Sequence, residues 1–517
     1  MKLNTKRTIF VGFAFFLICA FWQAYDATIP VILTNKYGMS QFWSGVIMAL
    51  DNVLALFMLP LFGALSDKCK SKRGKRTPFI VFGTVVAALA LLALTVVDNV
   101  QLTKISEYSS LDDVPTLNRI YEEQKDAVLK TPEGEEFVLG ELFTQEAFSQ
   151  IQVNEMNPVT GKKSVTTAYT NYVSPAREAC VAEITRQDPS MLIVFVALLL
   201  VVLVSMATFR SPAVALMPDV TVKPLRSKAN AIINLMGTAG GIIVLVLGIV
   251  FATSSVTNVF MSYSVYYAVI AGLMLLCLAV FLLTVKEPAW AKQMQEDTVR
   301  YGLSEKESDA DVKRKLTGGE KRSLILILVS VALWYFGYNA VTSKYAVYAS
   351  NILDMDYNTT MLLAQGAAVI AYLPAGIVAS KIGRKKTIIG GVAILAAAFG
   401  TASFMRAGSP VMLMNLLFAA AGVGWATINV NSFPMAVELS SGSDVGKYTG
   451  YYYTASMAAQ TATPLLSGLL MDKIADTVLF PYAAVFVTLA IVTMCFVKHG
   501  DNKIVAKKGI DAFDLED

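Results

Sequence analysis

The chain has 517 residues, of which 55% are hydrophobic and only 16% charged, and its mean hydropathy is +0.55. A soluble protein is usually about 45–50% apolar and about 25% charged, so most of this chain is expected to lie in lipid. A net charge of +4 excludes a strongly basic nucleic-acid-binding protein. Five cysteines in this length exclude a disulfide scaffold.

Twelve apolar stretches are long enough to span a bilayer, because a spanning helix needs about 20 residues. No alternating strand pattern accompanies them, and backbone groups in hydrocarbon must be bonded within their own segment. The sequence therefore predicts an all-α membrane protein with twelve transmembrane helices. In chain order the stretches are 8–33, 43–66, 77–97, 191–217, 228–252, 263–285, 323–349, 358–380, 387–405, 410–433, 447–471 and 479–497.

Basic residues gather on one side of the predicted membrane. The loop after the second stretch holds six Lys/Arg against the single acid Asp67, and the loop after the eighth holds four. With twelve crossings these loops and both ends of the chain share one side, which the positive-inside rule places in the cytoplasm. We expect a multi-pass plasma-membrane protein with both termini cytoplasmic, a charged cytoplasmic linker at 286–322 and a cytoplasmic tail at 498–517.

One polar segment, 99–190, interrupts the membrane pattern between the third and fourth stretches, on the extracellular side by this topology. It contains eight Lys/Arg and fifteen Asp/Glu, a net −7, so the rest of the chain carries +11. Turn signals such as Asp113-Val-Pro indicate short helices and turns. Its single cysteine, Cys180, excludes an internal disulfide. A cap or spacer over the outer mouth is the favoured interpretation, and a direct role in binding is the alternative.

The chain also repeats itself. Gly63-Ala-Leu-Ser-Asp67 follows the second stretch, and Gly376-Ile-Val-Ala-Ser follows the eighth, 313 positions later. Asp219 and Glu438 follow the fourth and tenth stretches and are 219 positions apart, so the two offsets differ by 94, nearly the length of the insertion. This indicates two pseudo-symmetric six-helix bundles with the substrate at their interface and alternating access. The N-terminal bundle comprises 1–98 and 191–285, and the C-terminal bundle comprises 323–497.

These motifs resemble the cytoplasmic signature of the major facilitator superfamily. The form Arg73-Gly-Lys-Arg-Thr-Pro-Phe-Ile80, with Phe209-Arg-Ser-Pro and Arg226-Ser-Lys-Ala-Asn-Ala231, is similar to the sucrose-carrier-like branch of the glycoside–pentoside–hexuronide cation symporters. The resemblance covers all twelve predicted helices but not the insertion. It implies transport of a sugar or glycoside.

The same resemblance implies a set of gating residues at the cytoplasmic helix ends. A carboxylate such as Asp67 at a helix end can hold a neighbouring helix in one conformation and release it in the other. Ordinary anchoring by basic residues is the alternative. The expected gating residues are Gly63, Asp67, Arg73, Gly74, Arg76, Asp219, Arg226, Gly376, Gly383, Arg384 and Glu438.

Ionisable residues within spanning segments are costly and indicate function. Asp26 and Asp51 both lie roughly 12–14 Å below the outer edge of the membrane, at about 1.5 Å per residue. Because two neighbouring carboxylates do not both ionise readily, one is expected to carry a proton. A single buried, protonated Asp without a transport role is the alternative. The paired aspartates of melibiose-type relatives correspond to Ala55 and Leu59 here, so the resemblance implies no sodium site, and proton coupling through Asp26 or Asp51 is preferred.

Aromatic and amide side chains within the predicted helices are candidates for substrate contact, because sugars are held by aromatic faces and fixed hydrogen-bonding groups. Packing is the alternative for each aromatic residue. For Arg210 the alternative is that its charge reaches the interface, and Lys344 is expected to do so at the outer surface. The expected substrate-binding residues are Trp22, Gln23, Asp26, Asn52, Arg210, Asn230, Asn234, Tyr338, Asn339, Trp425, Asn429 and Gln460.

Signals for enzyme chemistry are missing from the sequence. Gly161-Lys-Lys-Ser resembles the end of a phosphate loop, but Met156 occupies the position of its first glycine. We expect no cofactor, no metal site and no nucleic-acid partner, and a monomer whose partners are a small-molecule substrate, a coupling proton and the bilayer. The predicted function is proton-coupled symport of a sugar or glycoside. A carrier of another organic solute or lipid is the alternative, and a polytopic membrane enzyme or receptor is a remote one.

Overall fold

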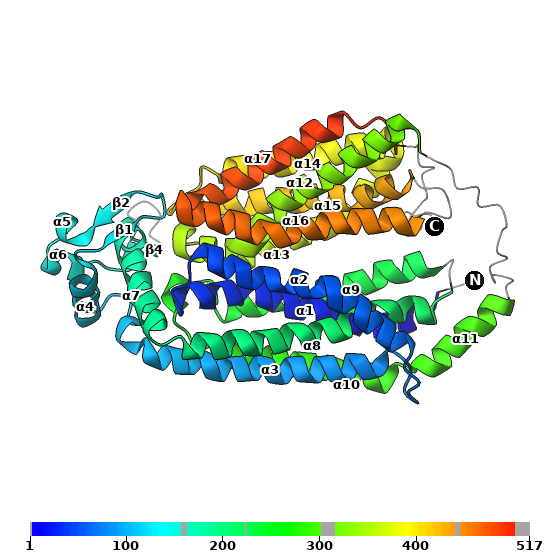
Figure 1. Cartoon of the computed structure of the whole chain (residues 1–517), viewed down its shortest axis with the longest axis horizontal. Helices are drawn as coiled ribbons and strands as arrows, with labels where there is room; N and C mark the ends of the chain where they lie inside the picture. Colours follow the sequence, from blue (N-terminus) through cyan, green and yellow to red (C-terminus); the bar gives the residue numbers. More distant parts are fainter. Residues whose placement is uncertain (1–2, 157–162, 223–224, 301–315, 440–444, 502–517) are drawn as a thin grey trace.

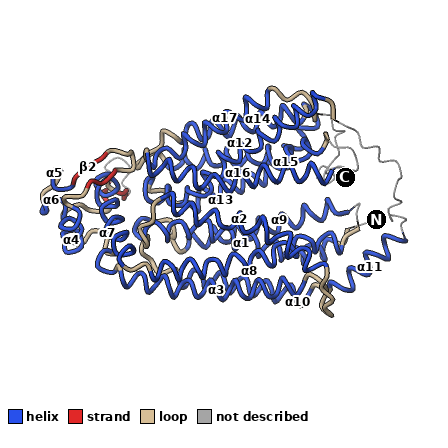
Figure 2. Tube along the Cα trace, in the orientation of Figure 1, coloured by secondary structure: helices blue, strands red, loops and turns tan. Residues whose placement is uncertain are grey.

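The computed structural model describes residues 3–156, 163–222, 225–300, 316–439 and 445–501. Within these residues, twelve long helices form an elongated bundle (Figures 1 and 2). Eleven of them are long and apolar enough to cross a membrane, and the twelfth, α16, has the length but is richer in Tyr, Thr and Gln. The prediction of an all-α, twelve-helix membrane protein is confirmed. The long helices are α1 (Thr5–Asn35), α2 (Gln41–Asp67), α3 (Thr77–Lys104), α8 (Ser190–Val220), α9 (Arg226–Val250), α10 (Ser264–Thr284), α12 (Gly318–Tyr348), α13 (Tyr357–Ile382), α14 (Arg384–Ala402), α15 (Val411–Val437), α16 (Val445–Lys473) and α17 (Leu479–Cys495).

The helices form two halves with the same internal packing. In the first half α1 packs on α9 and α10, α3 on α8 and α10, and α2 on α8. In the second half the equivalent helices pair in the same way: α12 packs on α16 and α17, α14 on α15 and α17, and α13 on α15. The halves meet where α2 contacts α16, α9 contacts α13 and α1 contacts α12. Each half has its own apolar core, so the two six-helix bundles predicted from the sequence repeats are present.

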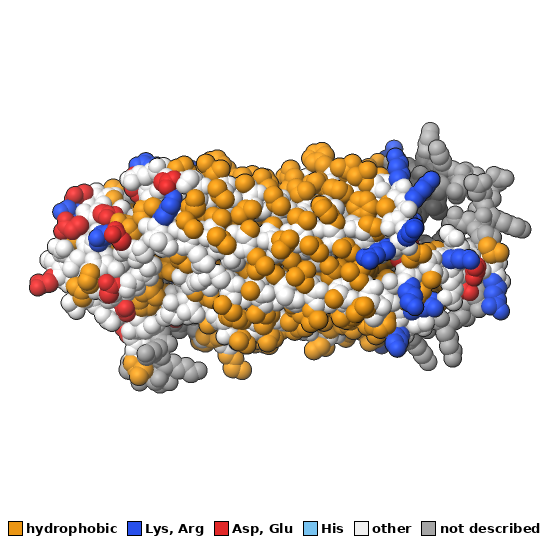
Figure 3. All heavy atoms as spheres, turned by 90° about the horizontal axis from the view of Figure 1, so that it is seen from below, with side chains coloured by type: hydrophobic (Ala, Val, Ile, Leu, Met, Phe, Trp, Pro, Cys, Tyr) orange, Lys and Arg blue, Asp and Glu red, His pale blue; other side chains and the backbone are white. Residues whose placement is uncertain are grey.

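Apolar side chains cover the middle of the molecule on the face shown in Figure 3. Many large apolar side chains of the long helices are strongly exposed, among them Phe57, Leu283 and Ile370. Charged side chains gather at the two ends, with acidic residues on the insertion and Lys and Arg at the end where the chain termini lie (Figures 1 and 3). An apolar belt between two charged ends is the surface that a bilayer-spanning protein needs.

The insertion is a folded unit that projects from one end of the bundle (Figure 1). Its apolar core includes Tyr108, Leu117, Phe148 and Cys180. Two short antiparallel strand pairs, β1 with β2 and β3 with β4, join the expected helices and turns. Its elements are η1 (Ser106–Tyr108), α4 (Val114–Gln124), β1 (Val128–Lys130), β2 (Glu136–Val138), α5 (Leu139–Leu142), α6 (Gln145–Ser149), β3 (Asn154–Met156), β4 (Lys163–Val165), η2 (Tyr169–Val173) and α7 (Ser174–Gln187).

Helix α3 runs to Lys104, beyond the predicted end at residue 97, because its polar last turns are buried against the first half. Asp98 forms an ion pair with Lys36, the residue after α1, at 2.7 Å, and both side chains are buried. The Lys36 ammonium also donates to the carbonyl of Met261 at 2.7 Å, and Gln101 donates to the carbonyl of Lys36 at 2.8 Å. A buried charge that is paired and hydrogen-bonded is tolerated, so hydropathy alone ends this helix too early.

The predicted linker between the halves contains a helix. In this segment α11 (Glu287–Arg300) packs against the first half and buries Trp290. Arg7 lies over the Trp290 ring at 5.2 Å and donates to Gln293 at 2.7 Å, which ties the start of the chain to α11. Residues 301–315 lie outside the described part of the chain.

Candidate functional site

The three embedded charges predicted to matter come together in the first half. Asp26 on α1 lies within electrostatic reach of Asp51 on α2, and Asp51 lies within reach of Arg210 on α8. The Asp51 carboxylate also accepts hydrogen bonds from the backbone and side chain of Asn52, at 2.6 and 2.8 Å. The Arg210 guanidinium lies 5.8 Å from the ring centre of Trp22. It therefore points into the bundle beside these residues and does not reach toward the interface.

A chain of amides links the first half to the second beside these charges. Gln365 on α13 donates to Gln23 on α1 at 2.5 Å, and Gln23 donates to the hydroxyl of Tyr357 at 3.2 Å. Gln365 and Tyr357 are missing from the residues predicted to bind substrate. Gln365 carried a usable signal, since it is an amide within a predicted apolar span.

Aromatic side chains of the second half face this group. Tyr338 on α12 stacks on Trp425 on α15, with ring centres 3.7 Å apart and planes at 4°, and Tyr335 meets the edge of the same indole at 5.2 Å. Asp26 lies close enough to the hydroxyls of Tyr338 and Tyr357 to interact with them electrostatically. The carboxylate of one half and the aromatic surface of the other thus border the same region between α1 and α12.

Several polar atoms in this region are buried without a hydrogen-bond partner among the described residues. They are the indole nitrogen of Trp22, the hydroxyl of Tyr25 and the amide nitrogen of Asn339. A buried donor without a partner costs about 1–3 kcal/mol. These groups are therefore suited to bind a polar ligand or ordered water. Asn429 hydrogen-bonds Tyr372 and is engaged within the second half.

The two asparagines predicted on α9 lie on the face that points toward the second half. A Cβ added to Gly241 of this helix would lie 3.2 Å from the side-chain oxygen of Gln365 and 3.8 Å from that of Gln23. Asn234 and Asn230 follow on the same face, since seven and eleven residues are nearly whole turns of a helix. Both are exposed, so the halves do not cover them. Gln460 on α16 is half-buried, and no described contact joins it to the other predicted residues.

The hydrogen bonds that the structure describes between the helices of the two halves lie from mid-bundle to the insertion end. At that end the carboxylate of Asp472 on α16 accepts the backbone N–H groups of Gln41 and Phe42, at 2.8 and 2.9 Å, and so caps α2 of the other half. Asn358 at the start of α13 donates to Thr253 at 3.0 Å. This conformation is closed at the insertion end.

The expectation that Lys344 reaches the outer interface is wrong. Lys344 is 0% exposed, and its ammonium donates to the backbone carbonyl of Gln41 and interacts electrostatically with Asp472 and Asp476. The last turns of α12 are covered by α2 and α16, so a lysine there is enclosed between the halves. The position of Lys344 in the sequence indicates its depth in the membrane, but it does not indicate which helices cover its side chain.

At the opposite end, Arg76 joins three segments of the first half. Its guanidinium donates to Asp219 at the end of α8 at 2.8 Å, to Asp67 at the end of α2 and to the hydroxyl of Ser66. The side chain of Arg76 is 5% exposed, whereas that of Asp67 is 59% exposed. Asp219 is therefore the better shielded partner. Arg73 is exposed and lies outside this network, and the side chain of Arg226, at the start of α9, lies outside the described residues.

The second half repeats this arrangement with fewer groups. Arg384 at the start of α14 forms an ion pair with Glu438 after α15. Gly376 lies in α13, seven residues before Gly383. Gly383 adopts a φ of +95°, and the carboxylate of Asp501 accepts the backbone N–H of Lys385 at 3.2 Å. The two predicted motif copies therefore occupy equivalent places at the same end of the molecule.

A carboxylate that sequence reasoning missed binds the first copy of the motif. Glu287 at the start of α11 accepts the backbone N–H groups of Arg76 and Thr77, at 2.9 and 2.8 Å, and the hydroxyl of Thr77 at 2.7 Å. Acids at the N-terminus of a helix satisfy its free N–H groups and its dipole. Glu287 lies more than 200 residues away in sequence, so no local pattern signals this contact.

Replacing Gly74 with alanine is expected to lower the free energy of unfolding by about 1–3 kcal/mol. Gly74 has a φ of +110°, and an added Cβ would lie 2.2 Å from the carboxyl carbon of Glu287. Thermal unfolding of the purified protein in detergent measures the effect. Gly390→Ala on α14, where an added Cβ meets nothing within 4 Å, is the matched control. Equal unfolding temperatures for the two variants would contradict the expectation.

Comparison with known proteins places this arrangement in a family. The profile of the Major Facilitator Superfamily matches residues 179–371 and 351–509, and that of the MFS/sugar transport proteins matches residues 10–105. The sucrose transport protein SUC4 of Arabidopsis thaliana is 39% identical over 60 residues. That alignment spans only 12% of this chain and 12% of SUC4.

Solved structures share the fold across almost the whole chain. The xylose transporter XylE from E. coli, in an inward open conformation, matches with a TM-score of 0.55 and 16% identity over 97% of both chains. A bacterial homologue of the iron transporter ferroportin, in an inward-facing state, matches with a TM-score of 0.58 and 11% identity over 96% of this chain and 99% of that one. These identities support the fold alone. The superfamily profile covers more than half of the sequence, and the chain belongs to the major facilitator superfamily.

Proposed function

We propose that this protein is a secondary active transporter that couples the movement of a sugar or glycoside to a proton by alternating access. The observation that carries the proposal is the region between α1 and α12, where Asp26 of one half faces the stacked Tyr338 and Trp425 of the other. An aromatic face, amide groups and unpartnered donors suit a polyhydroxylated ligand. The names of SUC4 and of a D-xylose-proton symporter of the same fold support sugar as the substrate class.

The coupling proton is assigned to the carboxylates within the bundle. Asp26 and Asp51 share one electrostatic environment, so protonation of one favours ionisation of the other. Arg210 lies beside Asp51, so its positive charge faces that carboxylate. Loss or gain of one proton therefore changes the charge that faces the substrate. We assign Trp22, Gln23, Asn52 and Asn339 to substrate binding or to positioning of these acids. Asn230 and Asn234, which the halves do not cover, are assigned to the open part of the substrate pathway.

The orientation belongs to the same proposal. The basic loops around Arg76 and Arg384 are placed in the cytoplasm by the positive-inside rule, so the insertion is extracellular and both termini are cytoplasmic. The conformation that is closed at the insertion end is then the inward-facing one. The protein acts as a monomer, since each half already supplies one wall of the site.

Uptake into proteoliposomes tests the proposal. The panel contains xylose, glucose, sucrose, maltose and uridine, each with and without an imposed pH gradient. Accumulation of one sugar above its external concentration, dependent on the gradient, is the expected result. A gradient of one pH unit supports up to about tenfold accumulation at one proton per substrate. Transport of uridine alone would favour a nucleoside carrier, since a nucleobase can also stack on the aromatic side chains. Equilibration of a sugar without accumulation would show that its transport is not coupled to the proton gradient.

A further inference from the structure

The insertion contacts the second half directly, although it belongs to the first half in sequence. These contacts lie at the ends of α12, α14 and α16, next to the closed end of the bundle. They are Val165 N–H to the Asp354 carboxylate at 2.9 Å, Thr477 N–H to the Pro132 carbonyl at 3.3 Å, Arg406 to Glu133 at 3.2 Å, Asn351 to Glu178 at 3.4 Å, and Gly134, whose backbone lies against the Ile474 carbonyl.

The insertion is held firmly to the first half. Val256 and Phe260, from the segment between α9 and α10, pack into the apolar core of the insertion. Arg177 on α7 lies 5.8 Å from the ring centre of Phe260, and its hydrogen bonds to the carbonyls of Ser110 and Leu111, at 3.0 and 2.7 Å, fix its side chain within the insertion. When the halves separate at this end, the insertion is therefore expected to move with the first half and leave the second.

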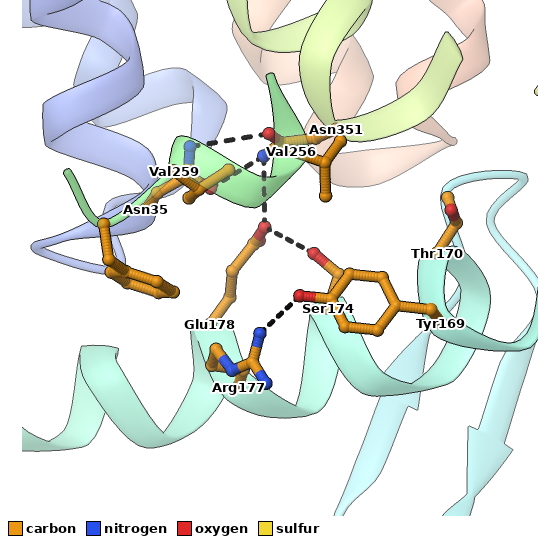
Figure 4. A pocket seen from close by; sticks show the side chains of 10 residues that line it. Asn35, Tyr169, Thr170, Ser174, Arg177, Glu178, Val256, Val259 and Asn351 are labelled. Atoms are coloured by element: carbon orange, nitrogen blue, oxygen red, sulfur yellow. Dashed lines mark hydrogen bonds between the residues drawn. The ribbon is translucent and has the colours of Figure 1, made fainter. Parts of the chain in front are cut away.

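A small cavity lies at the junction of the insertion and both halves (Figure 4). Its volume is about 20 Å³, which is large enough for about one water molecule. The carboxylate of Glu178 enters it from α7 and accepts from Ser174 and from Asn351 of the second half, each at 3.4 Å. Asn351 also donates to Asn35 of the first half at 2.8 Å. One side chain of the insertion thus meets the contact between the halves.

The surroundings of Glu178 disfavour a charged carboxylate. Burial, followed by the nearby charge of Asp476, raises the pKa of Glu178 to about 8, and the hydrogen bond from Ser174, the charge of Arg177 and the hydrogen bond from Asn351 lower it by less. Arg177 is already engaged by the hydroxyl of Tyr169, which also borders the cavity. No described cation forms an ion pair with Glu178. Once the second half withdraws, water reaches the carboxylate, and its pKa returns toward about 4.3.

We propose that the insertion is a pH-dependent strap that keeps the transporter closed at the insertion end while Glu178 is protonated and releases the second half when Glu178 ionises. This inference rests on the proposed alternating-access function. The direction follows from linkage: a group whose pKa is higher in the closed state stabilises that state at low pH, and the stabilisation is lost as the pH rises through the higher value. Between about pH 5 and pH 8, the ratio of open to closed molecules is expected to rise up to about tenfold per pH unit.

Distance measurements between spin labels test the strap without any substrate. Labels at Thr257→Cys in the first half and Phe404→Cys in the second, with Cys69 and Cys495 replaced by serine, report separation at the insertion end. With the native Glu178, the population at long distance is expected to grow from pH 5 to pH 9. Glu178→Gln, a neutral side chain of the same shape, is expected to stay closed across this range.

Control variants distinguish the role of Glu178 from that of nearby acidic residues. Glu183→Gln, on the same helix but bonded to the exposed Arg186, is expected to keep the native pH response. A native chain without a pH response, or a Glu178→Gln variant that retains it, would overturn the strap. Loss of the response in Asp476→Asn but not in Glu178→Gln would overturn the assignment to Glu178. Because the readout is distance, failure of sugar uptake does not affect it.

Discussion

Replacing Asp51 with asparagine is expected to abolish accumulation of substrate driven by a pH gradient. The amide cannot release a proton, and it leaves Arg210 without the carboxylate that lies beside it. The native protein is expected to accumulate substrate up to about tenfold per pH unit, and the variant is expected to reach about the external concentration. Uptake into proteoliposomes with an alkaline interior measures the difference.

Exchange of internal for external substrate provides the internal control for this prediction. Exchange requires binding and reorientation but no net proton movement, so Asp51→Asn is expected to retain it. Glu296→Gln on α11, which is exposed, controls for the chemical change and is expected to accumulate substrate as the native protein does. Full gradient-driven accumulation by Asp51→Asn would reject the role of this carboxylate. In that case Asp26→Asn becomes the decisive variant, because Asp26 faces Tyr338.

Replacing Arg76 with glutamine is expected to give the second large effect. The change removes the guanidinium that joins Asp219 and Asp67, which keep their ion pairs with Lys75 at 3.3 and 3.9 Å, and so weakens the connection between the ends of α2, α3 and α8. Breaking a fully buried pair costs about 3–5 kcal/mol. Asp67 is 59% exposed and Asp219 is 21% exposed, so solvent screening reduces the expected loss to about 1–3 kcal/mol. If the network forms in one conformation only, this loss shifts the conformational equilibrium by about 5–150-fold.

Thermal unfolding and initial uptake rate together measure the effect of Arg76→Gln. Arg73→Gln in the same loop is the matched control, because Arg73 is exposed and carries the same charge. It is expected to change stability by less than about 0.5 kcal/mol. Equal behaviour of the two variants would mean that the loop acts through net positive charge alone. That outcome would favour anchoring over gating for the whole motif.

The helical scaffold is readable from the sequence because hydropathy is a local property. Each predicted stretch corresponds to one long helix, and the recurrence of Gly63-Ala-Leu-Ser-Asp67 near Gly376 indicates two halves that indeed pack alike. The same local reasoning flagged Asp26, Asp51 and Arg210, since a charge in an apolar run is visible in one dimension. It misjudged Lys344 and the end of α3, where a polar residue is enclosed by protein.

The sequence by itself therefore determined the membrane class, the helix number, the two-half repeat and the positions of the embedded charges. Only the tertiary structure decided which groups meet: Gln23 with Gln365 and Tyr357, Glu287 with the start of α3, and the insertion with the second half. Hydropathy follows from the composition of one segment. A contact between residues hundreds of positions apart depends on how whole helices pack, and a single sequence does not encode that in any local pattern.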